Sequence, residues 1–318
     1  MFKIKEQIGK ESCIVIGGLG EYNLTDTMEC GQCFRYERVE CNELSARYVT
    51  VAYGHILDVG QRECGELIFF TDDDALVDMV GIPYFNLDTD LAEIKNDILR
   101  RTSSEWLKAA ADAAGGIAIL RQEPFETLIS FIISQNNNIP RIRKIVRQIC
   151  AEYGVNLALH NNLQKCPFKQ IDGTPCEEKC RECGRCYTFP SASDILENPE
   201  GLLPSHPGFR YGYILDACER VADGRVRLDM IAAARSFTHT LECLKEIRGV
   251  GDKVASCVAL FGFGNLDAFP IDVWMKRAID TYFDGELDVD ALGPYRGMAQ
   301  QYIFHYIRNI EGAQGKKS

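Results

Sequence analysis

Short apolar runs with alternating polar positions fill the first 70 residues of the chain. The segments SCIVIGGL, CFRYERV, ARYVTVAYGHILDVG and ELIFFT are rich in β-branched and aromatic residues, and Gly, Asn and Glu separate them. Alternation with a period of two turns one face of a strand to a core and the other to solvent. The pattern therefore predicts an antiparallel sheet joined by hairpins.

From about residue 88 the apolar positions recur with the spacing of helices. Thr89 or Asp90 can cap a helix in TDLAEIKNDILRR, and Pro140 and Gly154 can bound another in IPRIRKIVRQICAEYG. Similar patterns recur up to residue 310. We expect an α+β protein with a small antiparallel β-sheet domain over residues 1–87. A mostly helical body over 88–318 follows, with a cysteine-rich insertion at 160–190.

Composition and charge fit a globular protein of the reducing cytoplasm. Of the 318 residues, 46% are apolar and 25% are charged, which is enough to form a core. The sequence shows neither the apolar run of a signal peptide nor one of about 18 residues that could span a membrane. The net charge of −11 argues against nonspecific coating of nucleic acid, but it leaves room for a local basic face.

Five of the 14 cysteines lie in the segment CPFKQIDGTPCEEKCRECGRC, residues 166–186. The last four, Cys176, Cys180, Cys183 and Cys186, have the spacing C-x3-C-x2-C-x2-C. In a chain without a secretion signal, such spacing favours metal binding over disulfides. A structural zinc ion is our first expectation, an iron–sulfur cluster is the rival, and the absence of any metal is the third possibility. No organic cofactor is expected.

The segment HTLECLKEIRGVGDKVASCVALFGFG has the pattern of two helices joined by a Gly-Val-Gly turn. Gly249 and Gly251 permit positive φ angles and a close backbone approach. The amides at the start of the second helix can then receive a phosphate. This is the helix-hairpin-helix arrangement of proteins that hold the DNA backbone without reading its sequence. The plainer interpretation is a glycine turn between two packed helices.

Lys253 and Asp272 add candidate chemistry to this hairpin. Lys253 stands at the start of the second helix, and Asp272 follows Pro270 at the start of the next one. Asp272 can cap its own helix and also face the Lys253 helix. The pair suggests an amine nucleophile with an acidic partner, and an apolar surrounding favours the neutral amine that attack requires.

Five motifs occur in the order found in one enzyme family: GQCFRY (31–36), SQNNNIPRI (134–142), GFRYGY (208–213), GVGDKVASC (249–257) with PIDVW (270–274), and GPYRGMAQQYIFHY (293–306). On these motifs the chain resembles the 8-oxoguanine DNA glycosylase/AP lyase family of helix-hairpin-helix DNA glycosylases, over nearly its whole length except the cysteine-rich loop. Trp274, where eukaryotic members commonly have histidine, and the short length indicate a prokaryotic-type member.

The resemblance implies a bifunctional enzyme that flips oxidised guanine out of duplex DNA and excises it. Lys253 would attack the anomeric carbon and form a Schiff base, which permits strand cleavage by β-elimination. Asp272 would stabilise the positive sugar and help to orient Lys253. This chemistry needs no organic cofactor. Its expected partner is duplex DNA, and no membrane is involved. We expect a monomer that acts on the nucleoid.

The resemblance also implies how the extruded base is held. Cys257 and Phe304 would sandwich the ring, and the amide of Gln300 would bind its Watson–Crick edge. The carbonyl of Gly31 would accept a hydrogen bond from N7–H, the donor that oxidation at C8 creates. Helical spacing agrees, because Cys257 lies one turn after Lys253 and Phe304 one turn after Gln300.

A second group would hold the DNA around the gap. By the same resemblance, Asn136 would fill the space that the base leaves, and Arg141 and Arg210 would bind the orphaned cytosine. Phe209 would wedge into the stack on that strand. Residues 139–149 contain four cations and no acid, namely Arg141, Arg143, Lys144 and Arg147. They form a local basic stripe, or else an ordinary solvated helix face.

Two other functions fit part of the sequence. An alkylated-base DNA glycosylase of the same superfamily would keep the aspartate but typically lacks a lysine at position 253. A noncatalytic helix-hairpin-helix DNA-binding module would keep the glycines and the cysteines. Such a module has no need of Asp272, Gln300 and Phe304 in register.

Overall fold

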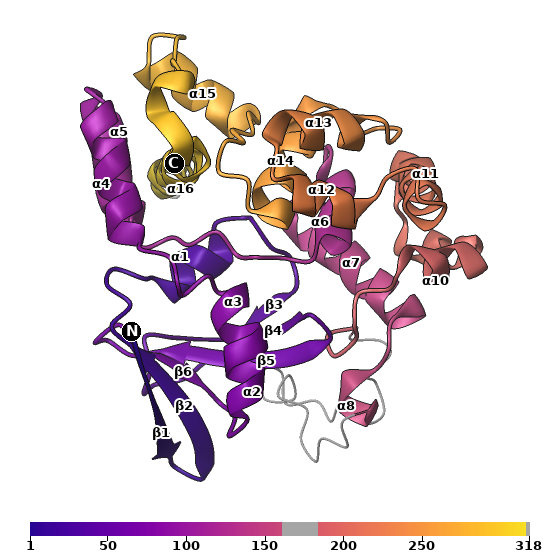
Figure 1. Cartoon of the computed structure of the whole chain (residues 1–318), viewed down its shortest axis with the longest axis horizontal. Helices are drawn as coiled ribbons and strands as arrows, with labels where there is room; N and C mark the ends of the chain where they lie inside the picture. Colours follow the sequence, from indigo (N-terminus) through magenta and orange to yellow (C-terminus); the bar gives the residue numbers. More distant parts are fainter. Residues whose placement is uncertain (161–183, 316–318) are drawn as a thin grey trace.

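The computed structural model describes residues 1–160 and 184–315, and it confirms the α+β fold (Figure 1). Six antiparallel strands form one sheet in the order β1-β2-β6-β5-β4-β3. The strands are β1 (Phe2–Ile8), β2 (Glu11–Gly17), β3 (Tyr36–Arg38), β4 (Ala46–Ala52), β5 (His55–Gln61) and β6 (Leu67–Phe69). The edge strand β1 was not predicted, because Lys3, Lys5, Glu6 and Gln7 make it mostly polar and its residues are largely exposed.

Helices make up most of the remainder. Those before the cysteine-rich insertion are α1 (Leu24–Glu29), α2 (Asp74–Leu76), η1 (Val77–Gly81), α3 (Ile82–Tyr84), α4 (Leu91–Arg101), α5 (Glu105–Ala114), α6 (Pro124–Ser134), α7 (Ile139–Tyr153) and α8 (Leu157–His160). Those after it are α10 (Ala192–Glu197), η3 (Pro199–Ser205), η4 (Gly208–Arg210), α11 (Tyr211–Ala222), α12 (Leu228–Ala234), α13 (Phe237–Lys245), α14 (Asp252–Phe263), α15 (Val273–Tyr282), η5 (Asp290–Tyr295) and α16 (Arg296–Gly315). None of these described helices is long and apolar enough to cross a membrane.

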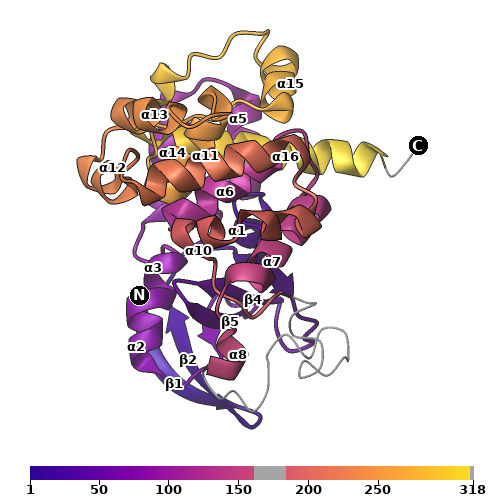
Figure 2. The same ribbon diagram turned by 90° about the vertical axis from the view of Figure 1, so that its right-hand side faces the viewer.

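The sheet and the helical body share one hydrophobic core. Figure 2 shows the sheet, with α2 and α8 beside it, below the helical body. Ile14, Tyr48 and Leu57 of the sheet belong to the same buried cluster as Leu260 of α14 and Ile303 of α16. The short helix α1, which the sequence patterns did not predict, lies between β2 and β3 in the chain and carries three buried residues. Because its chain continues into the turn at Gly31, this helix brings the N-terminal part of the chain to the helical body.

Strand β4 lies next to the edge strand β3, where a strand covered on one side only would leave its other face exposed. It is instead buried along its whole length. Val49 and Val51 pack with Leu157 and Cys186 in a second apolar cluster, apart from the main core. Leu157 lies just before the cysteine-rich insertion, and Cys186 lies in its described C-terminal part. These two segments therefore cover the second face of the sheet at β4.

Part of the expected basic stripe on α7 is engaged inside the protein. Arg143 and Arg147 both form ion pairs with Glu37 of β3, and Arg185 approaches the same carboxylate at 3.8 Å. The Arg143 guanidinium also lies 4.4 Å from the ring centroid of Tyr36. These two α7 cations attach the helix to the sheet, so Arg141 and Lys144 are the exposed members of the stripe.

Candidate active site

The turn between α13 and α14 requires glycine at one of its two positions. Gly249 has a φ of +82°, and an added Cβ would overlap the ring of Tyr213. Gly251 has a φ of −96° and a ψ of −174°, with open space around a built Cβ, so it does not use the positive φ that glycine permits. Gly251 instead stands at the N-cap of α14, where its missing side chain leaves the backbone open to a ligand.

Lys253 extends from the first turn of α14, a helix whose next turns are buried. Its Nζ lies 5.4 Å from the centroid of the Phe131 ring. Cys257 follows one turn later and is 4% exposed. Burial raises the pKa of the Cys257 thiol to about 11, against the opposing effect of the Lys253 ammonium group. The thiol therefore stays protonated at neutral pH and presents an uncharged sulfur to the cavity.

Asp272 caps α15, as the sequence indicates. Its Oδ1 accepts a hydrogen bond of 2.9 Å from the backbone N–H of Met275. Its negative charge also acts on Cys257, whose pKa it helps to raise. Asp272 and Lys253 line the same cavity, so the cap places a carboxylate beside the amine.

The cavity has a volume of about 360 Å³, within the usual range for small-molecule sites. It lies between the turn after α1, helix α6, the loop before α7, and helices α14, α15 and α16. All six residues expected at the catalytic and base-binding site line it: Gly31, Lys253, Cys257, Asp272, Gln300 and Phe304. The fold therefore brings together residues that are separated by more than 200 positions in the chain.

Gln300 is held in one orientation by its neighbour. Gln301, which is also buried, donates a hydrogen bond of 2.7 Å from Nε2 to Oε1 of Gln300. This contact leaves the amide N–H donors of Gln300 for a ligand in the cavity. Sequence reasoning did not single out Gln301, and its only signal was its place beside Gln300.

The turn at Gly31 is held in place because both polar atoms of the next side chain, that of Gln32, form hydrogen bonds. Gln32 is fully buried, and its Nε2 donates to the carbonyl oxygens of Thr27 and Ala118, both at 2.8 Å. Its Oε1 accepts from the N–H of Leu120 at 2.8 Å. Gly31 itself has a φ of +86°, and a built Cβ would lie 3.5 Å from Phe304 Cε1. Gln32 is thus a supporting residue that the sequence interpretation missed.

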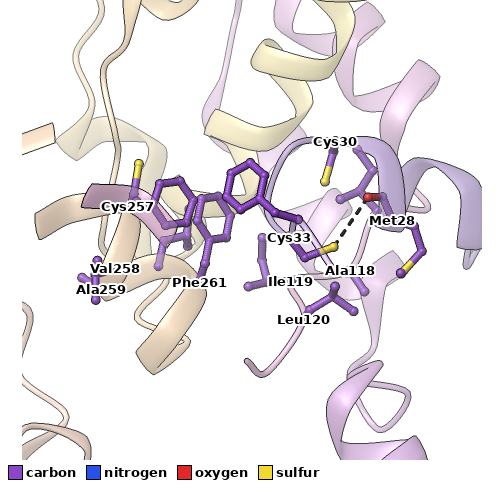
Figure 3. Packing of buried hydrophobic residues seen from close by; sticks show 14 of the residues in the cluster. Met28, Cys30, Cys33, Ala118, Ile119, Leu120, Cys257, Val258, Ala259 and Phe261 are labelled. Carbon is purple, nitrogen blue, oxygen red and sulfur yellow. Dashed lines mark hydrogen bonds between the residues drawn. The ribbon is translucent and has the colours of Figure 1, made fainter. Parts of the chain in front are cut away.

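Two cysteines flank this turn, and both are structural. The thiols of Cys30 and Cys33 donate to the carbonyl oxygens of Thr27 and Met28. Figure 3 shows Cys33 and Met28 joined by this contact, in the same packed cluster as Cys257 and Phe261 of α14. Burial raises the pKa of Cys30 to about 12. The region beneath the cavity is therefore a packed core with protonated thiols.

The four other residues expected to contact DNA meet beside the cavity without lining it. Asn136 has a φ of +47°, an uncommon left-handed conformation for a residue other than glycine. Arg210 stabilises it by donating to the carbonyl oxygens of Gln135 and Asn136. Arg141 donates to the carbonyl of His206 at 3.4 Å, and Phe209 is 54% exposed. This group combines cations, an exposed ring and a fixed asparagine turn.

The expected metal site falls mainly outside the described residues. Cys176, Cys180 and Cys183 lie there, whereas Cys186 is buried against Val49 and Val51 of β4. Among the residues that the structure describes, no group of three or more His, Cys, Asp or Glu side chains could hold a metal ion.

Comparisons with known proteins show which family the chain resembles. Residues 16–128 match the family described as 8-oxoguanine DNA glycosylase, N-terminal domain. The N-glycosylase/DNA lyase of Saccharomyces cerevisiae is 27% identical over 279 residues, which are 81% of this chain and 67% of the yeast protein. The structure of MBOgg1 in complex with a low-affinity DNA ligand is 31% identical, with a TM-score of 0.79, and the match covers 98% of this chain and 100% of that one.

A second solved structure is equally similar. The 8-oxoguanine glycosylase/lyase of Clostridium acetobutylicum, in complex with double-stranded DNA containing cytosine opposite 8-oxoguanine, has a TM-score of 0.80 at 29% identity. That match covers 98% of this chain and 99% of the Clostridium chain. A 3-methyladenine DNA glycosylase of Archaeoglobus fulgidus, at 17% identity and a TM-score of 0.62, shares the fold alone. The chain belongs to the 8-oxoguanine DNA glycosylase/lyase family.

Proposed function

We propose that this protein excises 8-oxoguanine from duplex DNA and then cleaves the strand at the abasic site. The observation that carries the proposal is the single cavity in which Lys253 and Asp272 stand beside Cys257, Gln300 and Phe304. The amine and the carboxylate suit a reacting sugar, while the thiol, the amide and the aromatic ring suit a flat base. The relatives named N-glycosylase/DNA lyase support the same reaction.

The reaction uses Lys253 as a nucleophile once, and its nitrogen then carries the Schiff base through the strand-cleavage step. Its neutral amine attacks C1′ of the extruded nucleotide, and the C1′–N9 bond breaks with its electron pair leaving on the base, which gains a proton. The sugar ring opens to give a protonated Schiff base on Lys253. Loss of a proton from C2′ then expels the 3′-phosphate oxygen, which is β-elimination. The Asp272 carboxylate stabilises the positive charge that develops on the sugar.

The other cavity residues hold the base during this sequence. The protonated Cys257 and the ring of Phe304 offer apolar faces to a flat heterocycle. Gln300, oriented by Gln301, offers its amide donors to the Watson–Crick edge. The Gly31 carbonyl accepts from N7–H, which oxidised guanine has and guanine lacks.

Borohydride trapping on a duplex that contains 8-oxoguanine tests the nucleophile. The wild-type protein is expected to form a covalent adduct, and Lys253→Gln is expected to form none. Lys108→Gln is the matched control, because Lys108 is paired with Glu105 on the surface of α5 and does not line the cavity. An adduct that persists in Lys253→Gln would reject the assignment, and release of alkylated bases without an adduct would favour the alternative glycosylase.

Cytosine is the proposed partner of the lesion. Arg141 and Arg210 lie close enough for the Arg141 charge to lower the pKa of Arg210, after the larger effect of burial. The Arg210 guanidinium bonds the Asn136 carbonyl and the Arg141 guanidinium bonds that of His206, and we place the orphaned base beside them. Excision rates measured opposite each of the four bases are expected to be highest for cytosine. Equal rates would contradict this role for the two arginines.

A structural metal ion in the insertion remains part of the proposal. Its support is the spacing of Cys176, Cys180, Cys183 and Cys186, with zinc first and an iron–sulfur cluster second. Elemental analysis and the visible spectrum of anaerobically purified protein distinguish the two, and a metal content of zero rejects both.

We further propose that the protein acts as a monomer in the cytoplasm of a prokaryotic cell. Size-exclusion chromatography tests the oligomeric state, and cell imaging tests the location.

A further inference from the structure

Arg308 is a cation of the base-binding cavity that the reaction described above does not use. It lies on α16 one turn after Phe304 and lines the cavity. Its guanidinium carbon is 5.3 Å from the centroid of the Phe304 ring. Its Nη1 lies 3.6 Å from the point where a Cβ on Gly31 would stand. The guanidinium therefore sits beside both the ring wall and the Gly31 backbone.

The donors of Arg308 have no partner among the residues that the structure describes. Within the described part of the chain, no hydrogen bond or ion pair joins its guanidinium to another residue. Lys253 and Arg308 are the only cations among the described residues that line the cavity. A guanidinium group carries five N–H donors in a planar fork and is permanently charged. A half-buried group of this kind, facing a cavity, favours a ligand with hydrogen-bond acceptors.

The position of Arg308 relative to Gly31 is fixed by a second contact. His305 on α16 places its Nε2 3.4 Å from Oδ1 of Asp26 on α1. The chain continues from α1 directly into the Gly31 turn, which Gln32 anchors. The two elements that carry Gly31 and Arg308 are thus connected outside the cavity as well as across it.

We propose that Arg308 is a specificity-determining residue that donates a hydrogen bond to a keto oxygen next to N7 of the flipped base. This inference rests on the proposed function, in which the Gly31 carbonyl faces N7–H. N7 is bonded to C8 and C5, and two keto oxygens of 8-oxoguanine flank it on the same edge of the base: O8 on C8, and O6 on C6, the neighbour of C5. Donation to O8 would favour the lesion over guanine, whereas donation to O6 would favour oxidised guanine over oxidised adenine.

Single-turnover excision with sulfur-substituted bases tests the contact. Sulfur is a weak acceptor, so the duplexes contain 8-oxoguanine, its analogue with sulfur at C8, or its analogue with sulfur at C6, each opposite cytosine. Arg308→Met keeps the length of the side chain and its packing on Phe304 but removes the donors. Loss of one charge-assisted hydrogen bond is expected to slow excision of 8-oxoguanine about 10-fold or more.

The pattern across substrates identifies the oxygen. The wild-type protein is expected to excise one of the two sulfur analogues more slowly than 8-oxoguanine, by a factor similar to the effect of Arg308→Met on 8-oxoguanine. On that same analogue, the excision rate of Arg308→Met is expected to be close to that of the wild type. Arg308→Lys should recover part of the rate on 8-oxoguanine. Arg100→Met is the matched control, because Arg100 is exposed on α4 and paired with Asp97.

Two results would overturn the inference. The first is an equal rate of Arg308→Met and wild type on 8-oxoguanine. The second is a uniform loss on all three substrates, which would indicate a phosphate contact or a structural role. Trapping of the wild-type protein is measured in parallel. A wild type that forms no adduct rejects the proposed function itself, whereas an adduct with either result above rejects only the role of Arg308.

Discussion

At the scale of single residues, Asp272 combines a structural task with a proposed chemical one. Its Oδ1 bonds the N–H of Met275 at the start of α15, and its charge stands in the cavity with Lys253. Asparagine caps helices about as well as aspartate but carries no charge. The two tasks can therefore be separated by one substitution.

We predict that Asp272→Asn keeps the stability of the protein and loses most of its activity. The melting temperature should stay near that of wild type, while the single-turnover excision rate should fall about 100-fold or more. Asp272→Ala is the control that removes both tasks, and its free energy of unfolding should fall by about 1 kcal/mol. Thermal melts and excision assays on the same samples measure both quantities. If Asp272→Asn excised the base at the wild-type rate, the Asp272 carboxylate would have no part in the chemistry.

Whether a site residue could be predicted from the sequence depends on what that residue does. Lys253, Asp272 and the walls of the cavity stand in motifs with recognisable residue types and spacing. Gln32, Gln301 and Arg308 have side chains whose importance comes from partners or surroundings far away in the sequence. Gln32, for example, bonds Ala118 and Leu120 from 86 and 88 positions away. Local patterns contain no signal for such contacts, so only the fold shows them.

At the scale of elements, the helices with a strong apolar period were predictable and the short or charged elements were not. Helix α4 begins at an expected cap, because Asp90 accepts a bond from a first-turn amide. Helix α7 has Pro140 in its first turn and ends at Gly154, as expected, but its cap, Asn138, was not predicted. Strand β1 was missed because it pairs along only one edge and is largely exposed. Helix α1 has six residues, too few to show a helical period.

The hairpin between α13 and α14 allows a matched pair of substitutions. Gly249→Ala should lower stability strongly, because the position has a φ of +82° and no room beside Tyr213. Gly251→Ala should fold almost as well as wild type, because its φ is −96° and the space around it is open. Chemical denaturation should show this difference directly.

The same pair tests whether the open N-terminus of α14 meets the DNA backbone. If a phosphate approaches Gly251, a methyl group there should weaken binding to duplex DNA in a folded protein. Binding is measured by fluorescence anisotropy at fixed salt, since phosphate contacts depend on ionic strength. Unchanged affinity in Gly251→Ala would place the phosphate elsewhere.

At the scale of the whole molecule, one buried arginine joins the parts around the site. Arg35 lies 3.4 Å from the Glu126 carboxylate on α6 and 3.2 Å from the thiol of Cys150 on α7. It also donates to the carbonyl of Tyr187, beyond the cysteine-rich insertion, at 3.1 Å. Arg35 follows the Gly31 turn by four residues, so this cluster connects the base-binding turn to both helices and to the end of the insertion.

Glu126 gives this cluster a measurable dependence on pH. Burial, with a smaller contribution from the neighbouring Glu123, raises the pKa of Glu126 from its ordinary value of 4.5 to about 7, although Arg35 acts in the opposite direction. Between these values the folded protein holds a proton that the unfolded chain has lost. The contribution of Glu126 to stability is therefore complete below pH 4.5 and disappears as the pH rises through 7.

We predict that the free energy of unfolding of wild type falls relative to Glu126→Gln between pH 5 and pH 7.5. The expected relative change is on the order of 3 kcal/mol, because each unit of pKa corresponds to about 1.4 kcal/mol. Denaturant titrations at several pH values measure it. Glu105→Gln, at a carboxylate whose side chain is 85% exposed, should give a profile parallel to wild type. If the Glu126→Gln profile were parallel as well, the carboxylate would already be ionised at pH 5, and its attraction to Arg35 would outweigh its burial.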